Sequence, residues 1–365
     1  MSKDFRTIQV TKSDLEEALK NNTFWSKKAS FIPFTKSKAQ WLLDNPRMDK
    51  SDVCAVIGYE GDEMVAFVYQ VPDWIKTSQG NKKVYWCRRW WVADRYKNSV
   101  LATFVMNEAV TAVDNQVLIK FLGKEVEEFY TKQPYTNFSE RIRYFILFSV
   151  DADLLVSKIK LFRFFRYPIK TLDVWSKKIV QIFNNLKLKK FTKNLVYEYI
   201  TKIDEPTWQF IEEACKNDCI IKDATYISWQ IRNDQYTQTP IENRYPFKCL
   251  IAGASYRIYS TSFKVLLDNK IIGFISAIVR GNEFDIKYFI ASDGHYDICI
   301  AALIENFNRS GANTIHTENE TLGKKIVKQY TSIYTDKRKL NALAHNDIDF
   351  DFKQVTVYDQ DGHFA

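Results

Sequence analysis

A strongly basic segment divides the chain and constrains how it can fold. Residues 158–193 contain 11 Lys or Arg residues and a single acid, Asp173. From residue 171 onward, apolar side chains recur at helical spacing, which predicts an amphipathic helix. These side chains are Leu172, Trp175, Ile179, Ile182, Phe183 and Leu186. The segment is therefore interpreted as a basic helical connector between two parts of the chain.

The same order of predicted elements appears on both sides of the connector. Before it we expect strands at 6–10, 54–60, 64–71, 83–92, 116–121 and 142–150, with helices at about 13–19, 99–113 and 124–132. After it we expect strands at 195–203, 262–267, 271–279, 284–291, 313–317, 337–343 and 352–358, with helices at 205–215, 225–233, 296–309 and 322–329. The repeated order predicts two copies of one α+β fold with a mixed sheet. The expected limits are an N-terminal domain at 1–152, a connector at 153–193 and a C-terminal domain at 194–365.

The connector's charge has three open explanations. Residues 1–205 carry a net charge of +10 and the rest of the chain −2. The excess can be a solvated cationic face on a packed helix, or a weak contact of residues 158–193 with a membrane surface or another polyanion. The third explanation, specific nucleic-acid binding, has the least support, because no recognised nucleic-acid module accompanies the charge, and specific DNA binding is not expected.

Spacings of glycine, histidine and cysteine exclude several common sites. The chain has only 11 glycines, and none forms a G-x-G or a P-loop pattern. The four histidines and six cysteines fit no zincin, zinc-ribbon or thioredoxin-like spacing, so no metal is expected. Sparse cysteines in apolar surroundings predict buried free thiols in a reducing compartment. With no signal-peptide pattern or long apolar run, we expect a cytoplasmic protein that does not span a membrane.

Residues 92–103, Val-Ala-Asp-Arg-Tyr-Lys-Asn-Ser-Val-Leu-Ala-Thr, join a predicted strand to a predicted helix. A helix N-terminus favours anions because its first amides are unpaired. The segment resembles the acyl-CoA signature of the GNAT N-acyltransferase superfamily, an Arg/Gln-x-x-Gly-x-Gly/Ala loop that wraps the CoA pyrophosphate. Lys97 takes the first place, Val100 stands where a glycine is usual, and Ala102 takes the last. The resemblance implies two tandem GNAT-like domains that move an acyl group, taken here as acetyl, from CoA to an amine.

The resemblance also implies roles for individual residues of the N-terminal copy. The acyl-CoA cosubstrate would be bound by Trp91, Val92, Ala93, Lys97, Asn98, Ser99, Val100, Leu101, Ala102 and Thr103. Tyr130 lies where family members place a tyrosine that protonates the departing thiolate. That transfer is uphill by roughly 2 kcal/mol for unperturbed pKa values, and a tyrosine packed on its own sheet is the alternative.

Contacts with the acceptor are less constrained. Trp86, Arg88 and Trp90 alternate onto one face of a predicted strand, so they are candidates for acceptor binding or for simple packing. The cationic, aromatic first half favours a small-molecule or sugar amine, including anionic ones. No glutamate occurs between residues 83 and 92, which leaves the general base unassigned.

The second copy departs further from the signature, with His295, Ile298 and Ile300 at the three loop positions. It is therefore interpreted as a scaffold or acceptor-binding domain. Residues 358–363 are expected to form a hydrated strand end. Two other functions remain open: a Fem-like transferase that uses aminoacyl-tRNA, and a degenerate, non-catalytic protein that binds acyl-CoA or another ligand.

Overall fold

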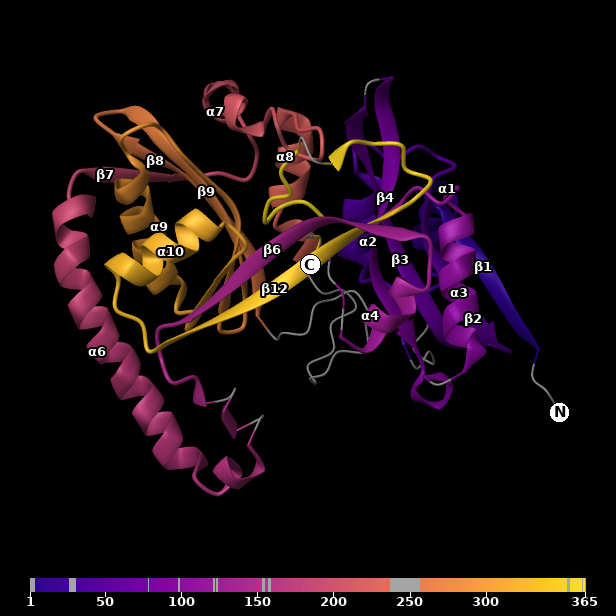
Figure 1. Cartoon of the computed structure of the whole chain (residues 1–365), viewed down its shortest axis with the longest axis horizontal. Coiled ribbons are helices and arrows are strands. Elements are labelled where there is room, and N and C mark those ends of the chain that lie inside the picture. The colour runs from indigo at the N-terminus through magenta and orange to yellow at the C-terminus, as the bar shows by residue number, and fades with distance from the viewer. Residues whose placement is uncertain are drawn as a thin grey trace.

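The computed structural model describes residues 4–25, 31–77, 79–97, 99–120, 122, 124–152, 155–156, 159–236, 257–352, 355–362 and 364. Within them one sheet of twelve strands crosses the molecule in the order β1-β2-β3-β4-β5-β12-β6-β11-β10-β9-β8-β7. Helices pack against this sheet (Figure 1). The fold class is α+β with a mixed sheet, as the sequence predicts.

The two halves repeat the same elements in the same order. The first half contains β1 (Phe5–Thr11), α1 (Lys12–Asn21), α2 (Lys36–Leu43), β2 (Val53–Glu60), β3 (Glu63–Thr77), β4 (Gly80–Val92), α3 (Val100–Thr111), β5 (Val117–Ile119), α4 (Lys124–Thr131) and β6 (Tyr135–Leu147). The second half contains β7 (Leu195–Tyr199), α7 (Glu205–Ile211), α8 (Ala224–Ile231), β8 (Ile258–Leu267), β9 (Lys270–Arg280), β10 (Glu283–Ala291), α9 (Tyr296–Ser310), β11 (Thr314–Thr317), α10 (Glu320–Gln329) and β12 (Tyr334–His345). The long helix α6 (Arg166–Thr192) connects them.

The two halves share their central strands. The C-terminal strand β12 inserts between β5 and β6 and pairs with β6 along its whole length, from Tyr334 opposite Leu147 to His345 opposite Tyr135. On its other edge β6 pairs with β11 of the second half. Backbone hydrogen bonds therefore join both halves into one sheet. The predicted limits at 152 and 193 lie in the connection between β6 and β7, and they stay a prediction.

Each half contains one β-bulge beside a pair of parallel strands. In β4 the register against β3 shifts around Arg88, and in β10 the register against β9 shifts around Lys287. A bulge bends its strand and increases the local twist. Just before each bulge the parallel neighbour stops pairing: β4 pairs with β5 at Tyr85 and Trp86, and β10 pairs with β11 only as far as Asp285. Beyond these points the parallel strands separate.

Helix α6 does not bury the apolar face that the sequence pattern defines. It packs on α9, with Val180, Asn184 and Leu188 buried. The six apolar side chains whose spacing predicts the helix are all exposed instead. The prediction of a helix is confirmed, but its apolar stripe faces away from the protein.

None of the helices in the described ranges has the length and apolar character needed to cross a membrane.

A glycine in α10 lies at the contact between the two halves of the chain. A Cβ built on Gly323 would lie 2.6 Å from the ring of Tyr144, a buried residue of β6. We expect Gly323→Ala to lower the free energy of unfolding by about 1 to 3 kcal/mol through overpacking, as measured by urea denaturation. The neighbouring exposed substitution Lys324→Ala should change it by less than about 0.5 kcal/mol. Stabilisation by Gly323→Ala, the usual result at an unconstrained helical glycine, would contradict this packing.

Candidate functional site

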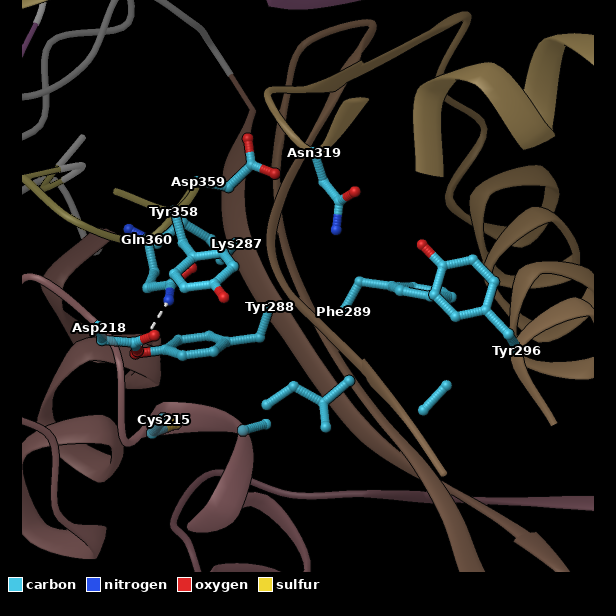
Figure 2. Close-up of a pocket in the computed structure, with 13 residues that line it drawn as sticks. Cys215, Asp218, Lys287, Tyr288, Phe289, Tyr296, Asn319, Tyr358, Asp359 and Gln360 are labelled. Atoms are coloured by element: carbon cyan, nitrogen blue, oxygen red, sulfur yellow. Dashed lines mark hydrogen bonds between the residues drawn. The ribbon is translucent and has the colours of Figure 1, made fainter. Parts of the chain in front are cut away.

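A pocket occupies the gap that opens between β10 and β11. Its volume is about 250 Å³. The lining comes from five parts of the chain: the end of β10, the start of α9, the segment after α7, Asn319 just before α10, and the C-terminal tail (Figure 2). The lining residues are Ala214, Cys215, Asp218, Lys287, Tyr288, Phe289, Ile290, Ala291, Tyr296, Asn319, Tyr358, Asp359 and Gln360. The site therefore begins at the β10 bulge and extends along β10 beyond its last pair with β11.

Asp218 places a carboxylate in the pocket wall. Lys222 binds its Oδ2 at 2.5 Å, and the Gln360 side-chain amide donates to the same oxygen at 3.4 Å. The other oxygen, Oδ1, is buried and has no hydrogen-bond partner among the described residues. Burial raises the pKa of Asp218 to about 6, and the nearby Asp361 adds to the shift. Asp218 can thus accept a proton close to neutral pH.

Tyr296 is the first residue of α9 and lines another part of the same pocket (Figure 2). Its hydroxyl is also buried without a hydrogen-bond partner among the residues that the structure describes. Burial raises the pKa of the Tyr296 phenol to about 12, so it stays protonated at neutral pH. Two residues of the pocket lining, Asp218 and Tyr296, thus each have a buried polar atom without a hydrogen-bond partner among the described residues. Buried groups in this state need a partner, and a ligand can supply one.

The C-terminal tail forms the third polar wall. The Asp359 carboxylate accepts from the Glu318 backbone N–H at 2.6 Å and from the Thr317 hydroxyl at 2.8 Å. Burial, and then the negative charge of Glu318, raise the pKa of Asp359 to about 7. The expectation of a hydrated strand end at 358–363 is wrong for the described part, because Gln360 and Asp361 are buried. Residues 355–358 form no strand beyond a single bridge between Thr356 and Asp218.

One buried amine binds the tail, and a second lies in the β10 bulge. The Lys120 ammonium, just after β5, donates to the backbone carbonyls of Tyr358 and Asp359 and lies 3.2 Å from the Glu318 carboxylate. Lys287, the extra residue of the β10 bulge, is also buried. Burial holds the pKa of Lys287 well below its usual range, and the positive charges of Lys120 and Arg88 lower it further. Both halves of the chain thus contribute charge to the surroundings of the pocket.

A nearby cluster of potential metal ligands already has cationic partners. Glu283, Asp285 and His316 place one ligand atom each within 4.8 Å of one another. Arg143 and Arg280 bind the Asp285 carboxylate at 2.7 and 3.0 Å, and Arg280 also binds Glu283. Burial raises the pKa of Asp285, but His316 and the two guanidinium groups hold it well below its usual range. We interpret the cluster as an ionic network between the halves.

The prediction of free thiols is confirmed for the five described cysteines, which are buried and unbonded: Cys54, Cys87, Cys215, Cys219 and Cys299. Cys249 lies outside the described residues.

The predicted loop of the N-terminal copy lies at the start of α3. The helix begins at Val100, and the Ser99 hydroxyl caps it by accepting from the Leu101 backbone N–H. Val100 is 87% exposed, no acid occupies the first turn, and Lys97 is exposed beside Asp94. This helix start is therefore accessible and electropositive. Trp91, Val92 and Ala93 precede it in the chain, Ala102 and Thr103 follow, and Asn98 lies outside the described residues.

The bulge in β4 changes how its aromatic residues are arranged. Trp86 is buried in the cluster that contains Leu118 and donates to the Asp73 carboxylate. Trp90 packs instead in the cluster that contains Tyr130, and donates to the Ala102 carbonyl at 3.1 Å. The expectation that Trp86, Arg88 and Trp90 share one face is wrong, because the extra residue at Arg88 reverses the alternation of the strand.

Tyr130 lies in the interior of the N-terminal half. Its side chain is 5% exposed, and its hydroxyl is 3.9 Å from the Met106 sulfur. Burial raises the pKa of Tyr130 well above its usual value. Its ring meets the Tyr135 ring edge to face at 5.3 Å. The role of Tyr130 as a proton donor stays a prediction.

Comparisons with known proteins give likenesses of structure only. No family model matches the sequence, and a search of curated proteins finds no relative. The fold is similar to a GCN5-related N-acetyltransferase from Kribbella flavida, at 12% identity and a TM-score of 0.47 over 95% of this chain and 72% of that one. A GCN5-related N-acetyltransferase from Anabaena variabilis gives 9% identity and 0.46 over 93% and 72%. Saccharomyces cerevisiae N-myristoyltransferase with bound myristoyl-CoA gives 12% and 0.47 over 95% and 83%. At these values no residue role is transferred to this chain.

The raised pKa of Asp359 predicts a pH dependence of stability. An aspartate has a pKa of about 4 in an unfolded chain and about 7 here. Between these values the folded protein holds a proton that the unfolded chain has released, so stability falls as the pH rises through this window. Asp359→Asn can keep both contacts of the carboxylate. We expect the free energy of unfolding of the wild type to fall relative to that of the variant between about pH 4 and pH 7.

Urea denaturation at constant ionic strength over a pH series measures this difference. Asp94→Asn, at a side chain that is 90% exposed, controls for the loss of one negative charge. Wild-type and Asp359→Asn curves that stay parallel across the series would show that Asp359 does not titrate in this way.

Proposed function

We propose that this chain transfers an acyl group, acetyl in the first instance, from a CoA thioester to the amine of a small molecule. We place the reaction in the pocket between β10 and the C-terminal tail. The observation that carries the proposal is a pocket beyond the last β10–β11 pair whose lining includes Asp218 and Tyr296, each with a buried polar atom that has no hydrogen-bond partner among the described residues.

The groups of the pocket match the proton transfers of aminolysis. An amine reaches the pocket mainly as an ammonium ion and must lose a proton before its lone pair can attack the thioester carbonyl carbon. Asp218 accepts that proton, since its pKa of about 6 leaves it mostly ionised at neutral pH. The C–N bond then forms, the C–S bond breaks with its electron pair leaving on sulfur, and the second proton of the nitrogen passes to that sulfur, so that CoA leaves as the thiol. Tyr296 stabilises the developing negative charge by donating a hydrogen bond.

The backbone supports binding of the thioester in the same gap. From Tyr288 to Ala291, β10 stays paired with β9, while its pairing with β11 ends at Asp285. Main-chain groups on that edge are available for the carbonyl and the pantetheine amides. Helix α9 starts at the end of this strand, and its N-cap residue, His295, makes no side-chain capping bond. The first amides of α9 can therefore bind an anion such as the CoA pyrophosphate.

The start of α3, predicted from the sequence, is the competing location for CoA. It has a lysine nearby and no acid in its first turn, whereas α9 has Asp297 there, bound to Lys325 at 2.7 Å. If CoA binds at the start of α3, the C-terminal pocket would hold only the acceptor. The acceptor stays a small-molecule or sugar amine, and the expected cytoplasmic location stays a prediction.

Two charge substitutions separate these locations. His295→Glu and Ala102→Glu each add a carboxylate at the start of one helix, where it would repel a pyrophosphate. We expect isothermal titration with acetyl-CoA to show binding by the wild type, a loss of about tenfold or more in affinity for His295→Glu, and no change for Ala102→Glu. The reverse pattern would place CoA at α3. Absence of binding by the wild type would refute the proposed activity, and retention of tRNA in its place would favour the aminoacyl-tRNA alternative.

The role of Asp218 predicts a pH-dependent rate. Release of CoA thiol from acetyl-CoA, measured against a panel of primary amines, should rise with pH through about pH 6 as Asp218 ionises. Asp218→Asn should abolish this rise and lower kcat/KM by about a hundredfold or more. Glu213→Gln, an exposed carboxylate earlier in the same segment, should leave the profile unchanged. A rise near pH 6 that persists in Asp218→Asn would exclude Asp218 as the base.

A further inference from the structure

The outer face of α6 is a second candidate for binding, independent of the proposed reaction. The helix has 27 residues, and its inner face rests on α9. The Asn184 amide donates to the Thr331 carbonyl at 2.9 Å and accepts from the Thr331 backbone N–H at 2.8 Å. The Lys187 ammonium donates to the Gln329 carbonyl at 2.9 Å. These contacts fix the rotation of α6 about its axis, and thereby decide which side chains face outward.

The side chains that face outward are large and apolar. Six of them are between 50% and 66% exposed: Leu172, Trp175, Ile179, Ile182, Phe183 and Leu186. At 3.6 residues per turn they fall within an arc of about 100°, opposite the buried Val180, Asn184 and Leu188. The segment before them adds Phe164 at 85% and Tyr167 at 84% exposed. We call the six side chains on α6 the apolar stripe. A continuous apolar surface of this length marks an interaction site rather than ordinary protein surface.

Basic side chains border the apolar stripe. Residues 158–193 carry a net charge of +10. Their single acid, Asp173, already accepts hydrogen bonds from the backbone N–H groups of Asp151 and Ala152. Lys178 extends over the Trp175 ring, with its Nζ 5.7 Å from the ring centroid. Lys189 and Lys190 are exposed near the C-terminal end of the helix. The partner of this face must therefore be both apolar and negatively charged.

We propose that this face of α6 binds the surface of a bilayer that contains anionic phospholipids. A helix with aromatic and aliphatic side chains on one side and lysines along its borders suits the boundary between headgroups and acyl chains. A nucleic acid would meet the lysines but leave the apolar stripe in water. A second copy of this chain would bring two faces of strong positive charge together. With its opposite face packed on α9, α6 would lie along the membrane surface.

Flotation with lipid vesicles tests this proposal on the full chain. We expect binding to phosphatidylcholine vesicles that contain about 30 mol% phosphatidylglycerol, and weak or no binding to phosphatidylcholine alone. The triple variant Trp175→Ser, Ile182→Ser, Leu186→Ser should lose about tenfold or more in affinity. The triple variant Lys178→Gln, Lys189→Gln, Lys190→Gln should lose about a hundredfold. The side chains replaced in both triple variants are exposed, so the thermal unfolding temperature should change little in either variant.

A matched charge control uses lysines outside α6. Lys202→Gln, Lys324→Gln, Lys328→Gln removes the same charge from exposed positions elsewhere, and should bind vesicles nearly as well as the wild type. Equal losses in this control and the α6 charge variant would reduce the effect to overall charge and overturn the proposal. Unchanged binding by the serine variant would also overturn it. So would a wild-type dimer, or a protein complex, that forms through the apolar stripe in the absence of lipid.

Discussion

The insertion of β12 between β5 and β6 is the constraint on which the rest of this structure depends. Around it, Lys120 and Arg141 from the first half meet Glu318 from the second. All three are buried, and a buried charge requires its partners. Lys120 uses its remaining hydrogen-bonding capacity on carbonyls of the C-terminal tail. The tail is thereby held against β10, where it closes one side of the pocket.

The two copies of the fold use the same irregularity differently. Each has a bulge with a basic residue where its parallel strands separate, Arg88 in β4 and Lys287 in β10. Burial lowers the pKa of Arg88 to about 10 and that of Lys287 well below its usual range. Beyond the β4 bulge, Trp90 packs against Phe129, and α3 starts with a serine cap. Beyond the β10 bulge lies a pocket, and α9 starts without a side-chain cap. The two halves therefore have the same order of elements but different local chemistry at the bulge.

Local patterns were sufficient to predict most elements, but not their neighbours. The strand predicted at 271–279 and the helix predicted at 296–309 depend on spacing within each segment, and they correspond to β9 and α9. The place of β12 depends on pairing with strands about two hundred residues away, for which no local signal exists. The bulge at Arg88 inverted the predicted faces of Trp86 and Trp90. Helical spacing predicted α6. An amphipathic pattern does not show, however, whether the apolar side packs on the rest of the protein or faces outward.

The burial of the site residues could not be predicted from the sequence either. A run such as Tyr358-Asp359-Gln360-Asp361 reads as solvated surface until a buried lysine from the other half is placed against it. Burying Asp218, Asp359 and Lys287 with shifted pKa values costs stability that well-packed apolar side chains of similar size would not. A tail needed only to complete the core could have used such side chains. The cost is hard to explain by packing alone, and it is explained if these groups exchange protons with a ligand in the pocket.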